Sequence, residues 1–188
     1  MTRVINLFGG PGTGKSTRAA QIFQQLKDLG VNAELVREYA KEWAWAGRKI
    51  TADDQDYIGA KQRRRESSLY GKVDVIVTDS PVILSPFYLQ YYYDDDSLTQ
   101  FTLNCLKRAE AKGVIHHNLY LKRMKPYMAK GRYENEEQAL AIDVSLRTWM
   151  QNHHVPFTDI VVEDEIKSKT IIDHLATDIA FEQILKGE

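Results

Sequence analysis

The sequence has almost no cysteine and no long apolar run. Cys105 is the single cysteine among 188 residues, which excludes an internal disulfide and a metal site built from several cysteines. No stretch approaches the roughly 18 consecutive apolar residues of a membrane-spanning helix. The apolar run Val4–Phe8 is short and is followed at once by glycines, unlike the core of a signal peptide. These absences favour a protein of the reducing cytoplasm without a membrane segment.

An excess of charge of one sign is also missing. The formal net charge is -1 at pH 7, so the overall electrostatic field gives no reason to expect nucleic-acid binding. Hydrophobic residues make up 43% of the chain and charged residues 27%, which is ordinary for a soluble globular protein. We expect a single domain over residues 1–188, a length that buries a core without disulfides.

Predicted strands and helices alternate along the chain. Short apolar runs predict strands over Val4–Phe8, Val31–Val36, Val73–Asp79, Val114–Leu121 and Phe157–Val162. Helical spacing of apolar residues predicts helices over Ser16–Leu29, Tyr39–Ala46, Thr51 to about Tyr70, Leu98–Lys112, Glu134–Asn152 and Lys169–Leu185. Pro81–Ser97 and Lys122–Arg132 show no clear element. This alternation predicts an α/β fold with a central parallel sheet flanked by helices on both faces.

The segment GGPGTGKS, from Gly9 to Ser16, matches the phosphate-loop pattern G-x-x-x-x-G-K-[ST] between a predicted strand and a predicted helix. Glycines let backbone N–H groups approach phosphate oxygens, and the helix N-terminus adds partial positive charge. Lys15 is expected to reach the β- and γ-phosphates, and the Ser16 hydroxyl to coordinate Mg²⁺. The predicted ATP-binding residues are Gly9, Gly10, Pro11, Gly12, Thr13, Gly14, Lys15, Ser16 and Thr17.

Acidic residues follow two of the predicted strands. Asp79 ends VDVIVTD, where it is expected to lie beside the phosphate loop and to hold Mg²⁺ directly or through water. Glu38, in VREYAKEW, is a candidate general base for an acceptor hydroxyl. Arg37 and Tyr39 are candidate acceptor-binding neighbours. The alternatives are a turn or capping residue for Asp79 and a surface acid at a helix start for Glu38, and the sequence leaves open which of the two is the base.

A basic segment, LKRMKPYMAKGRYENEE, follows the strand predicted over Val114–Leu121. We expect a lid at about residues 122–135 that closes over the transferring phosphate and excludes water. Arg123 and Arg132 are its best catalytic candidates, and Arg147 on the following helix is a weaker one. The alternative is a solvated basic loop.

The segments GGPGTGKST, VREYAKEW, VDVIVTDSP and LKRMKPYMAKGR together resemble the P-loop kinases. Within them, the chain is similar to the AAA-like P-loop family that includes the nicotinamide riboside kinase domain and related phage proteins. The likeness covers roughly residues 3–150. It implies a kinase fold with an arginine-rich lid, ATP with Mg²⁺ as donor, and an acid after the second strand, here Glu38, as base.

These observations favour an ATP-dependent phosphotransferase that transfers the γ-phosphate to a hydroxyl of a nucleoside- or nucleotide-like small molecule. One alternative is a kinase acting on a hydroxylated base or an end in DNA or RNA. The run Lys61–Arg65 and the aromatic stretch Pro86–Tyr93 would suit that acceptor, although the first can be a solvated face and the second core. Another alternative is an ATPase switch with a protein partner. The sequence does not determine the acceptor or the oligomeric state.

Overall fold

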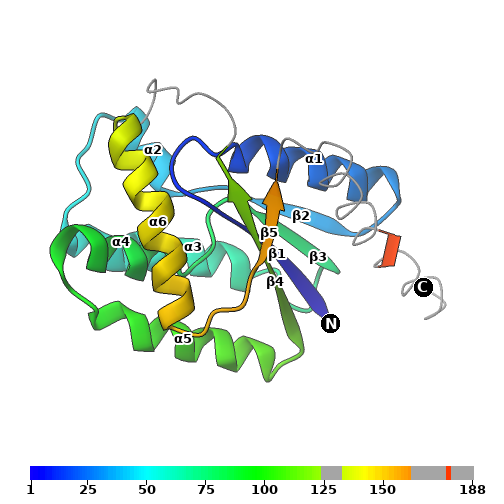
Figure 1. The fold of residues 1–188 in the computed structure, drawn as a ribbon. Coiled ribbons are helices and arrows are strands. Elements are labelled where there is room, and N and C mark those ends of the chain that lie inside the picture. Colours follow the sequence, from blue (N-terminus) through cyan, green and yellow to red (C-terminus); the bar gives the residue numbers. More distant parts are fainter. Residues whose placement is uncertain (124–132, 162–176, 179–188) are drawn as a thin grey trace.

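The computed structural model describes residues 1–123, 133–161 and 177–178. Its centre is a five-stranded sheet with the strand order β2-β3-β1-β4-β5. The strands are β1 (Thr2–Phe8), β2 (Ala33–Val36), β3 (Val75–Thr78), β4 (Val114–Lys122) and β5 (Thr158–Val161). Every neighbouring pair is parallel, so all the carboxyl ends lie at one edge of the sheet (Figure 1).

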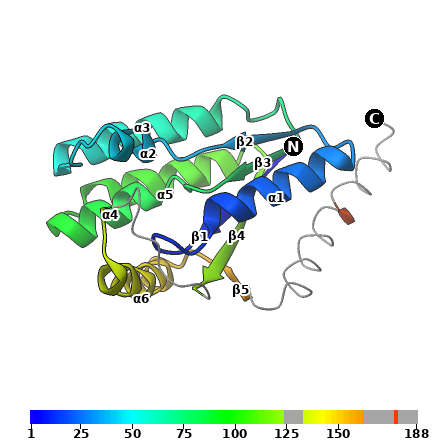
Figure 2. The same ribbon diagram turned by 90° about the horizontal axis from the view of Figure 1, so that it is seen from above.

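Helices cover both faces of this sheet, as the sequence predicts (Figure 2). The described helices are α1 (Lys15–Asp28), α2 (Ala40–Trp45), α3 (Ala52–Ser67), α4 (Leu84–Tyr93), α5 (Ser97–Glu110) and α6 (Glu136–Asn152). In the described part of the chain, none of them combines the length and apolar character needed to cross a lipid bilayer.

The side chains of β1 alternate between two cores because successive residues of a strand point to opposite faces. Ile5 and Leu7 pack against α1. Phe8 packs with α4 and α6 on the other face, and Val4 packs there with the end of α5. Since β1 is buried on both faces along its whole length, apolar residues point to both faces and the strand shows no strict alternation of apolar and polar residues.

One element was missed at the sequence level. Pro81–Ser97 was expected to contain no clear element, and this is wrong because α4 occupies Leu84–Tyr93. Its apolar and aromatic residues are spread around the helix, so no helical periodicity stands out. Pro86 lies in the first turn, where a missing N–H costs no intrahelical hydrogen bond. Most of the aromatic stretch is core: Phe87 is buried, and Tyr88 and Tyr91 pack against the same cluster.

The other predicted strands and helices are confirmed where they fall on described residues, with ends that differ by a few residues. The N-terminus of α3 is closed by a capping box, in which the Thr51 N–H donates to Asp54 Oδ2 at 2.8 Å. Most of the predicted lid, and the helix predicted over Lys169–Leu185 apart from the helical residues Thr177 and Asp178, lie outside the described residues.

The buried face of α3 carries an acid. Glu66 has no solvent exposure, and its Oε1 accepts a hydrogen bond from the Tyr70 hydroxyl at 2.5 Å. Among the described residues, its Oε2 has no hydrogen-bond partner. Burial raises the pKa of Glu66 from 4.5 to about 7, and the bond from Tyr70 offsets this only in part. The folded protein therefore holds a proton that the unfolded chain releases.

This pKa predicts that the protein loses stability as the pH rises. Between about pH 4.5 and pH 7 the folded state binds more protons at Glu66 than the unfolded state does, so its free energy of unfolding falls with pH. We expect Glu66→Gln, which keeps the shape without the charge, to be more stable than the wild type at pH 8 by up to about 3 kcal/mol. At pH 4 the difference should vanish. The measurement is urea unfolding at both pH values, with Glu110→Gln at the exposed end of α5 as control. A pH-independent difference would contradict the assignment.

Candidate active site

The loop from Gly9 to Lys15 connects β1 to α1 at the carboxyl edge of the sheet (Figure 1). Gly14 caps α1 with a φ of 90°, a left-handed conformation that favours glycine. The first turn of α1 carries no acidic side chain, which leaves the positive end of the helix open to an anion. Ser16 and Thr17 are exposed in this turn.

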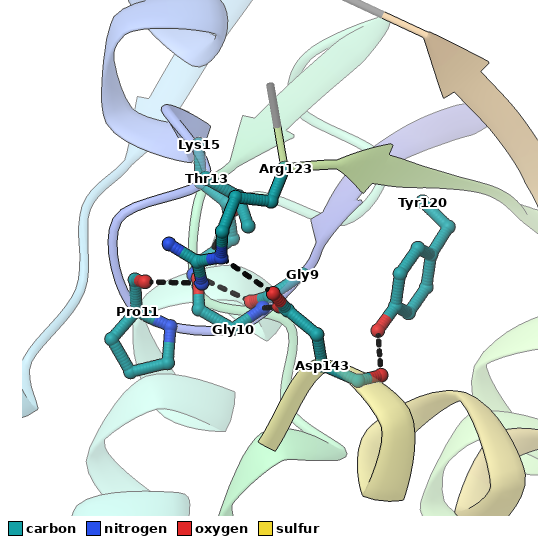
Figure 3. Close-up of polar contacts among 8 residues, drawn as sticks. All are labelled: Gly9, Gly10, Pro11, Thr13, Lys15, Tyr120, Arg123 and Asp143. Carbon is teal, nitrogen blue, oxygen red and sulfur yellow. Dashed lines mark hydrogen bonds and ion pairs between the residues drawn. The ribbon is translucent and has the colours of Figure 1, made fainter. Parts of the chain in front are cut away.

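Hydrogen bonds from Lys15 and Thr13 to carbonyl oxygens at the start of the loop hold the loop in a curved shape (Figure 3). Lys15 Nζ donates to the carbonyl oxygen of Gly9 at 2.7 Å and to that of Gly10 at 3.0 Å. The Thr13 hydroxyl donates to the same Gly10 oxygen at 3.0 Å. The lysine ammonium is thus kept over the loop, where a bound triphosphate would meet it.

Two of the glycines are required by close approach of neighbouring chain. A Cβ on Gly9 would lie 2.7 Å from Thr13 Oγ1 and 3.0 Å from the carbonyl oxygen of Leu121 in β4. A Cβ on Gly10 would lie 2.4 Å from Asp143 Oδ1 in α6. Such distances are far below a van der Waals contact. The phosphate-loop pattern asks for glycine at only the first of these positions, whereas the tertiary structure requires it at both.

Glu38 and Asp79 come together from neighbouring strand ends. Glu38 follows β2 and Asp79 follows β3, and the Glu38 N–H donates to Asp79 Oδ1 at 3.0 Å. Burial raises the pKa of Glu38 above its ordinary value, the nearby Lys15 ammonium lowers it, and the Asp79 carboxylate raises it again. The Glu38 carboxyl therefore lies within the electrostatic reach of the loop lysine.

A further acid and a tyrosine border Glu38. Glu134, just before α6, also acts to raise the pKa of Glu38, and Lys41 acts to lower it. Tyr88 of α4 is half-buried near both acids: burial, then Glu134, then Glu38 raise the pKa of its hydroxyl. The Tyr92 hydroxyl, one turn later, donates to Glu134 Oε1 at 2.9 Å. The charged and aromatic neighbours of Glu38 thus come from α2, α4 and the segment just before α6.

The backbone after Glu38 is held by a residue that sequence reasoning missed. Gln62, buried on α3, accepts the Tyr39 N–H at 3.1 Å through Oε1 and lies 3.5 Å from Thr78 Oγ1 through Nε2. The Tyr39 hydroxyl donates to Tyr57 at 3.3 Å, and the Arg65 guanidinium lies over the Tyr39 ring at 4.8 Å. Arg65 thus packs on neighbouring residues. A glutamine inside a run of charged residues gave no sign that it faces the core.

The predicted basic residues are only partly described. Arg123, at the end of β4, forms an ion pair with Asp143, with 2.7 Å between Nε and Oδ2. Arg147 pairs with Asp159 instead and stacks over Tyr120, so it turns toward the sheet edge. Arg37 is exposed. Arg132 lies outside the described residues.

Asp143 is the second functional candidate that sequence reasoning missed, although a signal was present. Ala139, Ile142 and Leu146 are the buried face of α6, and Asp143 falls on that face by helical spacing. An acid at a core-facing helical position is uncommon unless it is paired, and here it is paired with Arg123 and with the loop.

The donor groups for a magnesium ion are hard oxygens. The Ser16 hydroxyl and the Asp79 carboxylate follow the adjacent strands β1 and β3, and this chemistry fits Mg²⁺. Over the residues that the structure describes, no three His, Cys, Asp or Glu side chains form a metal-binding group. A site of this kind relies on substrate phosphates and water for its remaining ligands.

The glycine loop between the central strand and α1, with its lysine held over the loop, defines a P-loop protein. A sequence model for the family described as "AAA domain" matches residues 4–165. The chain therefore belongs to this family of P-loop proteins. No curated protein matches the sequence.

Several solved structures share this fold. Deoxyadenosine kinase from M. mycoides with bound dATP is similar with a TM-score of 0.58 and 18% identity, over 92% of this chain and 98% of that one. The same kinase with products dCMP and a flexible dCDP bound gives a TM-score of 0.56 and 22% identity, over 94% and 98% of the two chains. NadR protein in complex with NR gives 0.64 and 17%, over 93% of this chain and 50% of that one.

Gln62 offers a direct test of how the Glu38–Tyr39 segment is held. We expect Gln62→Leu to lower the free energy of unfolding by about 1–3 kcal/mol, because the partly buried Tyr39 N–H loses the acceptor that the buried Gln62 side chain provides. Gln24→Leu, at an exposed position of α1, is the matched control and should change it by less than about 0.5 kcal/mol. Urea unfolding measures both. Equal effects in the two variants would show that the hydrogen bond to Tyr39 contributes nothing.

Proposed function

We propose that this protein is an ATP-dependent kinase that phosphorylates a hydroxyl of a nucleoside-like small molecule carrying no phosphate of its own. The observation that carries the proposal is the position of Glu38, a partly buried acid within electrostatic reach of the phosphate-loop lysine and beside two further acids.

The donor side follows from the loop. Its glycines, the open N-terminus of α1 and the ammonium of Lys15 form the cradle that a triphosphate requires. On binding, Lys15 exchanges the carbonyl oxygens of Gly9 and Gly10 for oxygens of the β- and γ-phosphates. Magnesium, held by Ser16 and Asp79, would neutralise part of the phosphate charge.

The acceptor side follows from Glu38. As the acceptor oxygen attacks the γ-phosphorus, its proton passes to the Glu38 carboxylate. The bond from the γ-phosphorus to the β,γ-bridging oxygen breaks, and ADP leaves. Asp79 is less suited to this role because its Oδ1 already accepts the Glu38 N–H. Arg123 and Arg132 would stabilise the transferring phosphoryl group, with Arg37 and Tyr39 at the acceptor.

The charges around Glu38 argue for the acceptor class. Among the described residues, Asp79 and Glu134 act to raise the pKa of Glu38, and Lys15 and Lys41 act to lower it. An acceptor that already carries a phosphate, such as a nucleotide or a nucleic acid, would add negative charge beside these acids. A neutral or cationic hydroxyl compound avoids this repulsion. The solved structures with a similar fold include a deoxyadenosine kinase and a NadR protein in complex with NR.

The direct test is transfer of label from ATP labelled at the γ-phosphate. The protein is incubated with magnesium and three separate acceptor pools: nucleosides including deoxyadenosine and nicotinamide riboside, nucleoside monophosphates, and plain or base-hydroxylated DNA. We expect label in the nucleoside pool only. Label in the monophosphate pool or in DNA would overturn the proposed acceptor class, and free phosphate alone would indicate an ATPase instead of a kinase.

Lys15→Ala and Glu38→Gln should separate the two halves of the site. Lys15→Ala removes the cation at the phosphates, and we expect transfer to fall at least about a hundredfold, with weaker ATP binding.

Glu38→Gln should slow transfer by about 10²–10⁴-fold while leaving the ATP dissociation constant within about threefold. Steady-state kinetics and titration calorimetry measure these effects. Exposed Lys27→Ala and Glu42→Gln are the controls. Equal losses of transfer and ATP binding in Glu38→Gln would recast Glu38 as structural.

The raised pKa of Glu38 gives this activity a direction with pH. Only the deprotonated carboxylate can accept the acceptor's proton, so kcat/KM should rise with pH through a pKa above the ordinary 4.5 and then level off. Any residual activity of Glu38→Gln should lack this acidic limb. A limb that persists unchanged in the variant would assign it to another group.

A further inference from the structure

The carboxylate of Asp143 joins three separate parts of the chain (Figure 3). Its Oδ1 accepts the N–H of Gly10 in the loop at 2.6 Å. Its Oδ2 accepts Nε of Arg123 at 2.7 Å, and Nη2 of the same arginine donates to the Pro11 carbonyl oxygen at 2.6 Å. The side chains of Asp143 and Arg123 and the backbone of Gly10 and Pro11 therefore form a closed ring of hydrogen bonds.

The residues of this ring are largely shielded from solvent, and a hydrogen bond from Tyr120 holds Asp143 in place. The side chains of Arg123 and Asp143 are only 10% and 17% exposed, so water weakens their ion pair less than it weakens a surface pair. The Tyr120 hydroxyl of β4 donates to the backbone oxygen of Asp143 at 2.6 Å, which fixes α6 at this residue (Figure 3). A flexible surface pair would have neither feature.

Gly10 has the shape that this contact requires. Any side chain there would begin 2.4 Å from Asp143 Oδ1 and 3.0 Å from the carbonyl oxygen of Ala139 in α6. The φ angle of Gly10 is not positive, so its backbone conformation does not require glycine. The reason for glycine at this position is the approach of α6.

We propose that Asp143 is a positioning residue for the phosphate-donor site. Through Gly10 it holds the first half of the loop, and through Arg123 it holds a guanidinium against Pro11, so that both are in place before the triphosphate arrives. The inference rests on the proposed function only in taking the donor to be a nucleoside triphosphate.

Asp143 affects triphosphate binding by fixing the shape of the loop, and it does not attract the phosphates. The negative charge of Asp143 offsets the positive charge of Arg123 beside the loop, so it adds no attraction for phosphate. A loop fixed in advance loses less conformational entropy on binding, and this improves affinity without a new contact. Removing the carboxylate should therefore weaken binding even though a negative charge leaves the neighbourhood of the phosphates.

The test is ATP binding by titration calorimetry, with no acceptor present, together with the thermal unfolding midpoint of the ligand-free protein. Asp143→Asn keeps an oxygen for the Gly10 N–H but loses the ion pair with Arg123. Asp159→Asn is the matched control, because Asp159, on the edge strand β5, also pairs with an arginine of α6, Arg147, and with Lys122 at 3.8 Å.

We expect Asp143→Asn to weaken ATP binding about tenfold, with a midpoint within about 3 °C of the wild type, and Asp159→Asn to bind ATP as the wild type does. Unchanged or tighter ATP binding by Asp143→Asn overturns the proposal while leaving the kinase assignment intact. Weaker binding with a large fall in the midpoint overturns it too, because the carboxylate would then be structural. If the wild-type protein does not bind ATP, the donor assignment fails together with this inference.

Gly10→Ala tests the same contact from the other side. In the wild-type background the added methyl displaces the Asp143 carboxylate, and ATP binding should weaken at least as much as in Asp143→Asn. In an Asp143→Ala background the clash with the carboxylate is gone and only the Ala139 carbonyl remains close, so the same substitution should have a smaller effect. Equal effects in both backgrounds would contradict the role of the carboxylate.

Discussion

A phosphate cradle has to keep backbone N–H groups available to its ligand, so the loop must be held in shape mainly by its other polar groups. The loop from Gly9 to Lys15 takes its order from its other polar groups: its carbonyl oxygens accept Lys15, Thr13 and Arg123, and the N–H of Gly10 is bound by Asp143. The central position of β1 then fixes where the loop lies, with β3 on one side and β4 on the other. Each neighbouring strand end brings its own side chain to the loop.

The strand order also sorts the charges of the site. Asp79 and Glu38 follow β3 and β2 on one side of the loop, and Arg123 follows β4 on the other. The acids therefore lie on one side of the loop, and Arg123 contacts it from the other side through Pro11. Lys15 is within electrostatic reach of Glu38 and partly offsets the effect of burial on the pKa of that acid. A carboxyl group and an ammonium group from different strand ends are thus brought close together.

The buried face of α3 contributes polar groups as well as hydrophobic packing. Gln62 binds the backbone next to Glu38, and Glu66 lies one turn further along the same face. A helix that buries a glutamine and an acid has a weak apolar stripe. Its attachment depends on hydrogen bonds to the site as well as on hydrophobic contact.

Much of the fold could be predicted because its signals are local. The run before Gly9, the glycine loop and the helix after it lie within about thirty residues, where chain connectivity alone sets the geometry. The acids at strand ends could be predicted as candidates because parallel strands share one carboxyl edge. The helix α4 could not, since its aromatic residues face the core on several sides and give no periodicity.

The sequence by itself determined the class of the protein, since a phosphate loop needs only adjacent residues of the right type and φ. Only the tertiary structure decided which distant side chains complete the site. Gln62, Glu134 and Asp143 come from α3, from the segment before α6 and from α6, and nothing near them in the chain marks their partners. The second glycine of the loop shows the same division. Its identity is local, but its cause is a helix more than a hundred residues away that approaches to hydrogen-bond distance.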